Sequence, residues 1–452
     1  MSKYLKHFPG LILLCVVFSP PLKFLPSLLS AVRAEDFLLV PVAAFVLLSV
    51  RWRPPSNARR DALPALFAYL GLCGMVGMNI GVLAFRQNLI VKDLILLPQI
   101  IKYILIYVVM KRLLASAEIA DTTKRYILVS AFLAALVGVA QYWNLFDVNA
   151  WFSPLYISKQ ELLTIMLDPT MNWRVRGTMV NANIYGTALV WHASFALAHC
   201  TNATKRKTQV VSLLATLLLA FAIALTQSRS SLGLLVIIWT LTLFTGTRYG
   251  AKRNLLSFRA VVLVILMVLA LWGLADWIET SQRGFGSRLA LSTSSAQTSY
   301  KARIRDLVQP IFQTFDAPLS IPFGRGPSKT ALRTDSHNGY GWILLRFGLV
   351  GLVLYLGILM TILRRAVGSL NAEAHQENRA IVLFVFLTVC VWILVEFTNA
   401  NFKLPSLIAL NMFSAGWLSA ELSKGLHPVS QKRPSSSLTK PTNPFHSNKL
   451  SC

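Results

Sequence analysis

Long apolar runs separated by short polar segments dominate the chain. About twelve of these runs approach the roughly 20 residues that a helix needs to cross the hydrocarbon core of a bilayer. They cover residues 9–31, 36–50, 62–84, 93–114, 126–146, 184–200, 209–226, 231–246, 260–277, 339–363, 380–398 and 404–420. The runs are continuous, whereas a transmembrane β-barrel shows alternating segments of about ten residues. The pattern therefore predicts an all-α, polytopic membrane bundle of about 12 transmembrane helices.

Composition supports this class. Of the 452 residues, 55% are hydrophobic and 14% are charged, and the mean hydropathy is +0.56. A soluble domain has about 25% charged residues, so this chain cannot cover itself with a polar surface. The net charge of +26 would by itself suggest a nucleic-acid partner. Nucleic-acid binders are not this apolar, so we expect a membrane protein with basic loops and no nucleic-acid partner.

The basic residues also predict an orientation, because Lys and Arg gather in cytoplasmic loops. With the N-terminus inside, 25 of the 44 Lys and Arg residues lie on the cytoplasmic side, and the reverse orientation loses this bias. We therefore expect both termini in the cytoplasm and two long periplasmic loops, at about 147–183 and 278–336. Residues 1–425 are expected to form the transmembrane domain. Residues 426–452, rich in Ser, Pro and Lys, are expected to be a disordered cytoplasmic tail.

The second long loop carries a net charge of +4, although the positive-inside rule expects few cations there. A long loop can be translocated regardless of its charge; alternatively, the outer face receives an anionic ligand. Apolar residues recur in this loop at helical spacing, which predicts an amphipathic helix at the membrane interface, bent by Pro310. They are Ile304, Leu307, Val308, Ile311, Phe312 and Phe315. Lys301 and Arg305 flank this stripe, where their stems can reach toward lipid phosphates.

No cofactor chemistry is visible in the sequence. The five cysteines lie in the apolar runs or at the C-terminus, and none lies in the two long loops. They form neither a disulfide framework nor a metal-ligand spacing. A Walker loop and a dinucleotide fingerprint are also missing from the sequence. We therefore predict no cofactor and no metal.

One histidine and several arginines lie on the predicted periplasmic side. His337 stands where the second long loop meets the tenth apolar run, a position suited to proton transfer at neutral pH. If the helix is regular, Gly348 lies about three turns below it on the same face. The arginines fall into three groups: Arg174 with Arg176, Arg229 alone between two apolar runs, and Arg303 with Arg305. A single interfacial arginine often anchors lipid headgroups, but guanidinium forks also suit pyrophosphate oxygens.

Four sequence patches occur in a characteristic order. They are Arg176-Gly177-Thr178 followed by Asn181 and Asn183; Thr226-Gln227-Ser228-Arg229-Ser230; Arg303 followed by Phe323-Gly324-Arg325-Gly326-Pro327; and His337-Asn338 followed after nine residues by Gly348-Leu349. In this order the patches resemble the O-antigen polymerase/ligase superfamily, bacterial inner-membrane glycosyltransferases that act on polyprenyl-pyrophosphate-linked sugars. The resemblance covers roughly residues 173–351.

The resemblance implies a metal-independent transfer of a glycan from a polyprenyl-pyrophosphate-linked oligosaccharide donor to a sugar hydroxyl at the periplasmic face. His337 resembles the general base, and Arg176 and Arg229 would act with it as catalytic residues that hold the pyrophosphate. The substrate-binding residues would be Arg303, Arg305, Arg174, Arg325, Asn338 and Asn183. The acceptor would be a second lipid-linked glycan, or lipid A core if the protein is a ligase. A chain-length regulator is a further partner compatible with this role.

Several functions fit these features. The pattern of His337 and Gly348 is typical of ligases, whereas the long first loop is more typical of polymerases of O-antigen, capsule or exopolysaccharide; we favour a polymerase. Two family features are missing: an Arg and a Gly separated by ten residues in the loops, and a proline at the position of Ala182. A secondary transporter, such as a flippase for the same lipid, is the other alternative, because it would use charges inside the spans. The charged candidates are Lys23, Lys102, Arg346 and Glu396.

Overall fold

The computed structural model describes residues 2–18, 34–49, 61–87, 94, 96–151, 174–179, 181–203, 205–249, 294–326, 338–371, 378–398 and 404–425. Within these ranges the chain is helical and contains no strand, so the prediction of an all-α protein is confirmed. The α-helices are α1 (Ser2–Leu5), α2 (Phe8–Phe18), α3 (Ala34–Ser49), α4 (Ala62–Phe85), α6 (Leu96–Leu113), α7 (Ala117–Trp143), α10 (Ala182–Asn202), α11 (Arg206–Leu225), α12 (Arg229–Tyr249), α15 (Ser294–Phe315), α16 (Gly339–Asn371), α17 (Arg379–Val395) and α18 (Pro405–Gly425). Two short 3-10 helices are η1 (Leu145–Asp147) and η2 (Pro318–Ser320).

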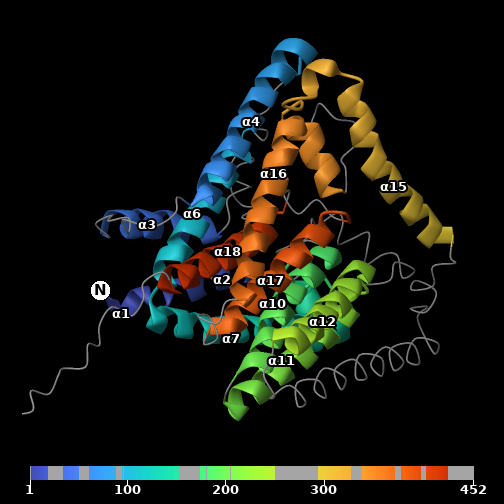
Figure 1. Ribbon diagram of the computed structural model, residues 1–452. Helices are drawn as coiled ribbons and strands as arrows, with labels where there is room; N and C mark the ends of the chain where they lie inside the picture. Colours follow the sequence, from blue (N-terminus) through green and yellow to red (C-terminus); the bar gives the residue numbers. More distant parts are fainter. Residues whose placement is uncertain are drawn as a thin grey trace, which may run out of the picture.

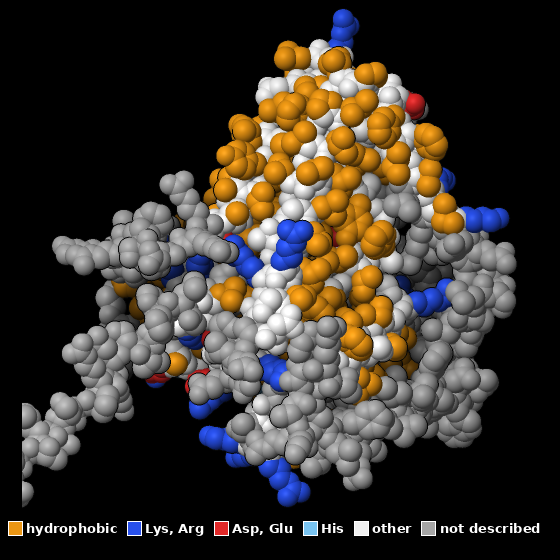
Figure 2. Space-filling view, viewed as in Figure 1, with side chains coloured by type: hydrophobic (Ala, Val, Ile, Leu, Met, Phe, Trp, Pro, Cys, Tyr) orange, Lys and Arg blue, Asp and Glu red, His pale blue; other side chains and the backbone are white. Residues whose placement is uncertain are grey.

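Four of these helices, α4, α7, α11 and α16, are long and apolar enough to cross a membrane. Their outer faces carry exposed apolar side chains, such as Leu83 on α4 and Val353 on α16. Figure 2 shows an apolar surface over the upper part of the molecule, where Figure 1 draws α4 and α16. This surface suits contact with lipid, which supports a membrane protein; the number of twelve spans stays a prediction.

The helix α10 lies at the centre of one group of helices. Nearly all its side chains from Tyr185 to Ala198 are buried, as expected for a helix surrounded by others. It packs against α7, α11, α12 and α17, while α18 packs on α6 and α16 packs on α4 (Figure 1). The amphipathic helix predicted in the second long loop is present as α15, which runs through Pro310 without ending there and packs against α16.

Polar residues at the helix ends explain where hydropathy misplaces a boundary. The helix α7 starts at Ala117, earlier than the predicted residue 126, because Ser116 is extended and Glu118 lies in the first turn. A carboxylate is favourable there because it faces the positive end of the helix dipole. The predicted span 260–277, residues 19–31, most of the loop 147–183 and the tail 426–452 lie outside the described residues.

One carboxylate joins the ends of four helices. Asp61, which caps the start of α4, accepts hydrogen bonds from Tyr107 (2.5 Å) and Lys111 (2.5 Å) on α6. Its other oxygen accepts from Arg365 on α16 (3.1 Å). The Tyr107 hydroxyl also lies 2.6 Å from the Ser419 hydroxyl on α18. We call these five residues the Asp61 cluster; the predicted topology places all of them on the cytoplasmic side.

The Asp61 cluster holds its carboxylate in the charged form. Burial raises the pKa of Asp61, but the hydrogen bonds from Lys111 and Tyr107 lower it. The charges of Arg365 and Lys111 act in the same direction, so the pKa of Asp61 lies below its ordinary value. The cluster therefore contributes stability that depends on an ionised Asp61.

Candidate functional site

The loop before α10 is fixed to the turn between α11 and α12 by a single guanidinium. Arg174 donates to the side-chain oxygen of Asn183 (2.8 Å) and to the backbone oxygens of Thr226 (3.2 Å) and Gln227 (3.2 Å). Asn183 stands in the first turn of α10, which Asn181 caps by accepting from the Asn183 backbone nitrogen. We call Arg174, Asn183, Thr226 and Gln227 the Arg174 cluster. It brings together two of the four sequence patches.

The Arg176-Gly177-Thr178 segment is also attached to α7. The Gln141 side chain accepts from the Gly177 backbone nitrogen (2.7 Å) and donates to its carbonyl oxygen (3.3 Å). Gly177 has φ +54°, and a side chain there would overlap the ring of Tyr185, so glycine is required. Gln141 was not singled out from the sequence, because one glutamine in an apolar run gives no spacing signal.

The two predicted catalytic arginines differ in exposure. Arg176 is half-buried, whereas the Arg229 side chain is exposed at the first residue of α12. Arg229 stands at the turn between the two apolar helices α11 and α12. This turn is held by Ser228, whose hydroxyl accepts from the Ser231 backbone nitrogen (3.3 Å). Arg229 is therefore accessible at the same turn that Arg174 binds.

The first turn of α16 is anchored on the end of α17. The Asn338 side chain donates to the backbone oxygen of Phe397 (3.1 Å) and accepts from the Gly341 backbone nitrogen (2.8 Å). The Gly339 nitrogen donates to the backbone oxygen of Glu396 (2.7 Å). Asn338 thus has a structural role at this turn. His337, which directly precedes it, lies outside the described residues.

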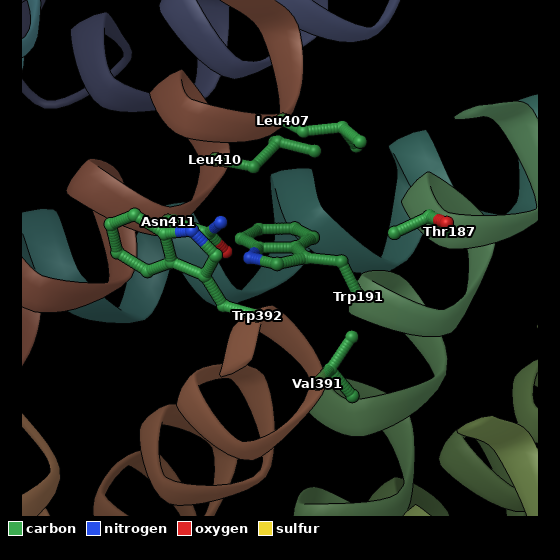
Figure 3. A pocket seen from close by; sticks show the side chains of 7 residues that line it. All are labelled: Thr187, Trp191, Val391, Trp392, Leu407, Leu410 and Asn411. Carbon is green, nitrogen blue, oxygen red and sulfur yellow. The ribbon is translucent and has the colours of Figure 1, made fainter. Parts of the chain in front are cut away.

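A small cavity lies between α10, α17 and α18 (Figure 3). Its lining residues come from α10, α17 and α18 and are Thr187, Trp191, Val391, Trp392, Leu407, Leu410 and Asn411. Thr187 donates to the backbone oxygen of Asn183 (2.9 Å), and Trp392 donates to the Glu396 carboxylate (3.1 Å). Asn183 and Glu396 thus each lie about one helical turn from a residue that lines the cavity.

The helix α16 breaks at Gly348, which has φ +70° and ψ −169°. The expectation of a regular helix from His337 to Gly348 is wrong at this residue. Backbone groups of the loop after η2 pair with those freed by the break: Arg325 N donates to Leu345 O (3.0 Å), and Leu349 N donates to Ile321 O (2.8 Å). Gly324, at φ +72°, lies directly against this break. Glycine is needed here because two backbone segments meet at a conformation that other residues avoid.

Arg325 lies in the loop after η2, next to the break in α16. Its guanidinium donates to the backbone oxygen of Gln313 (2.7 Å) and lies over the Phe85 ring, 5.1 Å from the ring centroid. Burial lowers the pKa of Arg325, while the charge of Asp316 raises it. Arg325 thus contacts α15 and α4, whereas Arg174 contacts α10 and the turn between α11 and α12. Arg303 and Arg305 lie on α15, where Arg305 is exposed and the Arg303 side chain lies outside the description.

The charges considered for a transporter have partners inside the protein. Lys102 on α6 forms ion pairs with Glu35 (3.0 Å) and Asp36 (2.6 Å) on α3. Arg346 donates to the backbone oxygen of Gly326 (3.4 Å) beside the break in α16. A structural role is sufficient to explain these contacts. Lys23 lies outside the described residues.

No protein-family model matches the chain, and no curated protein is significantly similar to it. Among the described residues, no group of three or more His, Cys, Asp and Glu side chains is placed to hold a metal ion. The function is therefore argued from the site itself and from the resemblance of its motifs.

Proposed function

We propose that the protein is a membrane glycosyltransferase of the O-antigen polymerase/ligase type. It joins polyprenyl-pyrophosphate-linked oligosaccharide repeats into a surface polysaccharide, such as O-antigen, capsule or exopolysaccharide, at the periplasmic face of the bacterial inner membrane. The observation that carries the proposal is the Arg174 cluster. Its contacts join the Arg176-Gly177-Thr178 loop to the turn that ends in Arg229, which suits two motif patches that act on one substrate.

The proposed chemistry uses the charge of these arginines. Arg176 and Arg229 hold the pyrophosphate of the donor, whose negative charge grows as it leaves the anomeric carbon. The acceptor hydroxyl attacks that carbon from the opposite side, and His337 takes the hydroxyl proton. The carbon–oxygen bond to the acceptor forms as the bond to the diphosphate breaks. The anomeric configuration is therefore inverted, and no metal is required.

A ligase that transfers the finished chain to lipid A core is the second candidate. It is favoured by the His337-Asn338 motif with Gly348 after nine residues. However, Gly348 is also required by its backbone conformation at the break in α16. A structural reason for this glycine weakens the motif as an argument for a ligase, and the polymerase stays our first proposal.

Reconstitution tests the reaction directly. The purified protein in vesicles receives a lipid-linked oligosaccharide, without nucleotide or ion gradient, and gel analysis of the products shows whether they lengthen. We expect lengthening by the native protein and by Arg125→Ala, an exposed arginine on α7 that is remote from the site motifs, and a loss of activity in His337→Ala. Full activity of the His337→Ala variant would exclude the general-base role. Transport of the lipid without any longer product would favour the transporter.

A deletion strain separates the two transferases. Loss of a polymerase leaves surface lipopolysaccharide capped with single repeats. Loss of a ligase leaves bare core and an accumulated lipid-linked polymer. Unchanged surface polysaccharides of every kind would contradict both functions.

A further inference from the structure

The helix α15 turns an apolar stripe to the outside of the protein. Five of its large apolar side chains are exposed at spacings that place them on one face: Ile304, Val308, Ile311, Phe312 and Phe315. Phe312 is 64% exposed and Phe315 is 54% exposed. The opposite face is buried at Pro310 and Thr314, where α15 packs against the rest of the protein. The stripe thus lacks cover from the described part of this chain.

The stripe continues onto η2 and onto α16, which is itself a candidate membrane span. Next to it, Leu319 follows in η2, and Leu349 and Val353 are exposed on α16. Figure 2 shows one apolar surface over this part of the molecule. Soluble monomers rarely expose patches of more than a few hundred Å², so a patch of this kind marks a contact with lipid or with another protein.

The charges on α15 favour lipid over a second protein as the occupant of this apolar surface. Lys301 and Arg305 are exposed near the middle of α15, beside the stripe. Cations that flank the apolar face of a helix are typical of helices lying in a membrane interface, where their stems follow the apolar surface and their heads reach lipid phosphates. A second copy of this chain would bring the same cations to the contact, which like-charge repulsion would disfavour.

We propose that α15 lies in the membrane leaflet on the predicted periplasmic side, with its apolar stripe among the acyl chains and Lys301 and Arg305 at the phosphates. The occupant of this surface is the bilayer itself. The inference is independent of the glycosyltransferase reaction, because it rests only on α15 and the neighbouring spans. In this placement lipid anchors α15. The loop after η2 connects α15 to the break in α16 through backbone hydrogen bonds.

Spin-label accessibility tests this placement. In a full-length background whose five native cysteines are replaced, nitroxides are attached after Phe312→Cys or Phe315→Cys. A label after Val353→Cys is the lipid control, and a label after Asp316→Cys, an exposed polar position, is the water control. The protein is placed in vesicles of phosphatidylethanolamine and phosphatidylglycerol. Collision rates with oxygen and with a water-soluble nickel chelate are then measured.

We expect both stripe positions to match the Val353 control, with high oxygen and low nickel accessibility. Accessibility like that at Asp316 would overturn the proposal, because the stripe would then face water. Strong magnetic coupling between labels on two copies would also overturn it, because a second chain would then occupy the stripe. Two stripe positions are used so that one poorly folded variant, identified by circular dichroism, does not decide the result.

Discussion

The Asp61 and Arg174 clusters both contain an arginine, but the groups that accept its hydrogen bonds differ in charge. In the Asp61 cluster, one carboxylate accepts from Lys111 and Arg365, so the cations are paired with an anion inside the protein. In the Arg174 cluster, one guanidinium donates to Asn183, Thr226 and Gln227, whose accepting oxygens all belong to neutral groups. Both clusters join several helices, and the predicted topology places them on opposite sides of the membrane.

The difference indicates different tasks. An ion pair fixes helix ends and also satisfies its charges, so it contributes mainly to stability. The three neutral acceptors fix the direction of the Arg174 guanidinium and bring no negative charge to it. We therefore interpret the Asp61 cluster as structural and the Arg174 cluster as the support of an anion-binding site.

The largest expected effect is on activity. Arg174→Ala should lower the rate of oligosaccharide lengthening by about 100-fold, because Arg174 positions the loop and the turn that carry Arg176 and Arg229, and a small misplacement of such groups costs about this much. Arg174→Lys should recover little of this activity, because an ammonium cannot reproduce the planar fork. The measurement is the initial rate with reconstituted protein. A full recovery by lysine would show that only charge, and not direction, matters at this residue.

The matching change in the other cluster should affect stability. Asp61→Asn leaves Lys111 and Arg365 without their carboxylate and should lower the free energy of unfolding by about 2 kcal/mol. The lengthening rate per folded molecule should change much less than in Arg174→Ala. Denaturation in detergent, followed by circular dichroism, measures the first effect. A large loss of rate with unchanged stability would contradict the structural interpretation of Asp61.

Acidification should have a smaller effect, on the thermal stability of the protein. Because the pKa of Asp61 in the folded protein lies below its ordinary value of 3.8, its contribution is present above that value and is lost as the pH falls through the lower, folded-state pKa. As the pH is lowered from about pH 5 through this folded-state pKa, thermal stability should therefore fall by more in the native protein than in Asp61→Asn. Identical pH profiles would mean that Asp61 titrates alike in the folded and unfolded protein.

The sequence predicted the helices better than the contacts between them. The apolar run 62–84 became α4 almost unchanged, because hydropathy alone defines a helix that faces lipid on one side. The start of α7 was missed, since its first turns are polar. The break at Gly348 was missed as well, because a glycine within an apolar run is compatible with a continuous helix. Only the backbone of the distant residues 320–326 shows that the break is needed.

The candidate site was predicted in part for a similar reason. The motifs identified Arg174 and Asn183 as residues of one function, and the structure shows them in direct contact. The directions of side chains, however, depend on packing between segments far apart in sequence. The exposure of Arg229 and the role of Gln141 were invisible in the sequence for this reason. His337 stays a prediction, because it lies outside the described residues.

Asn183→Asp tests the central claim most directly, because it gives Arg174 the kind of partner that the Asp61 cluster contains. The Asn183 side-chain oxygen lies 2.8 Å from the guanidinium, and a carboxylate of the same shape in the first turn of α10 is favourable for the helix. We predict unchanged or higher stability and a lengthening rate at least about 10-fold lower, with a smaller loss in Asn183→Ala. A rate equal to that of the native protein would contradict the claim that the charge of Arg174 serves the substrate.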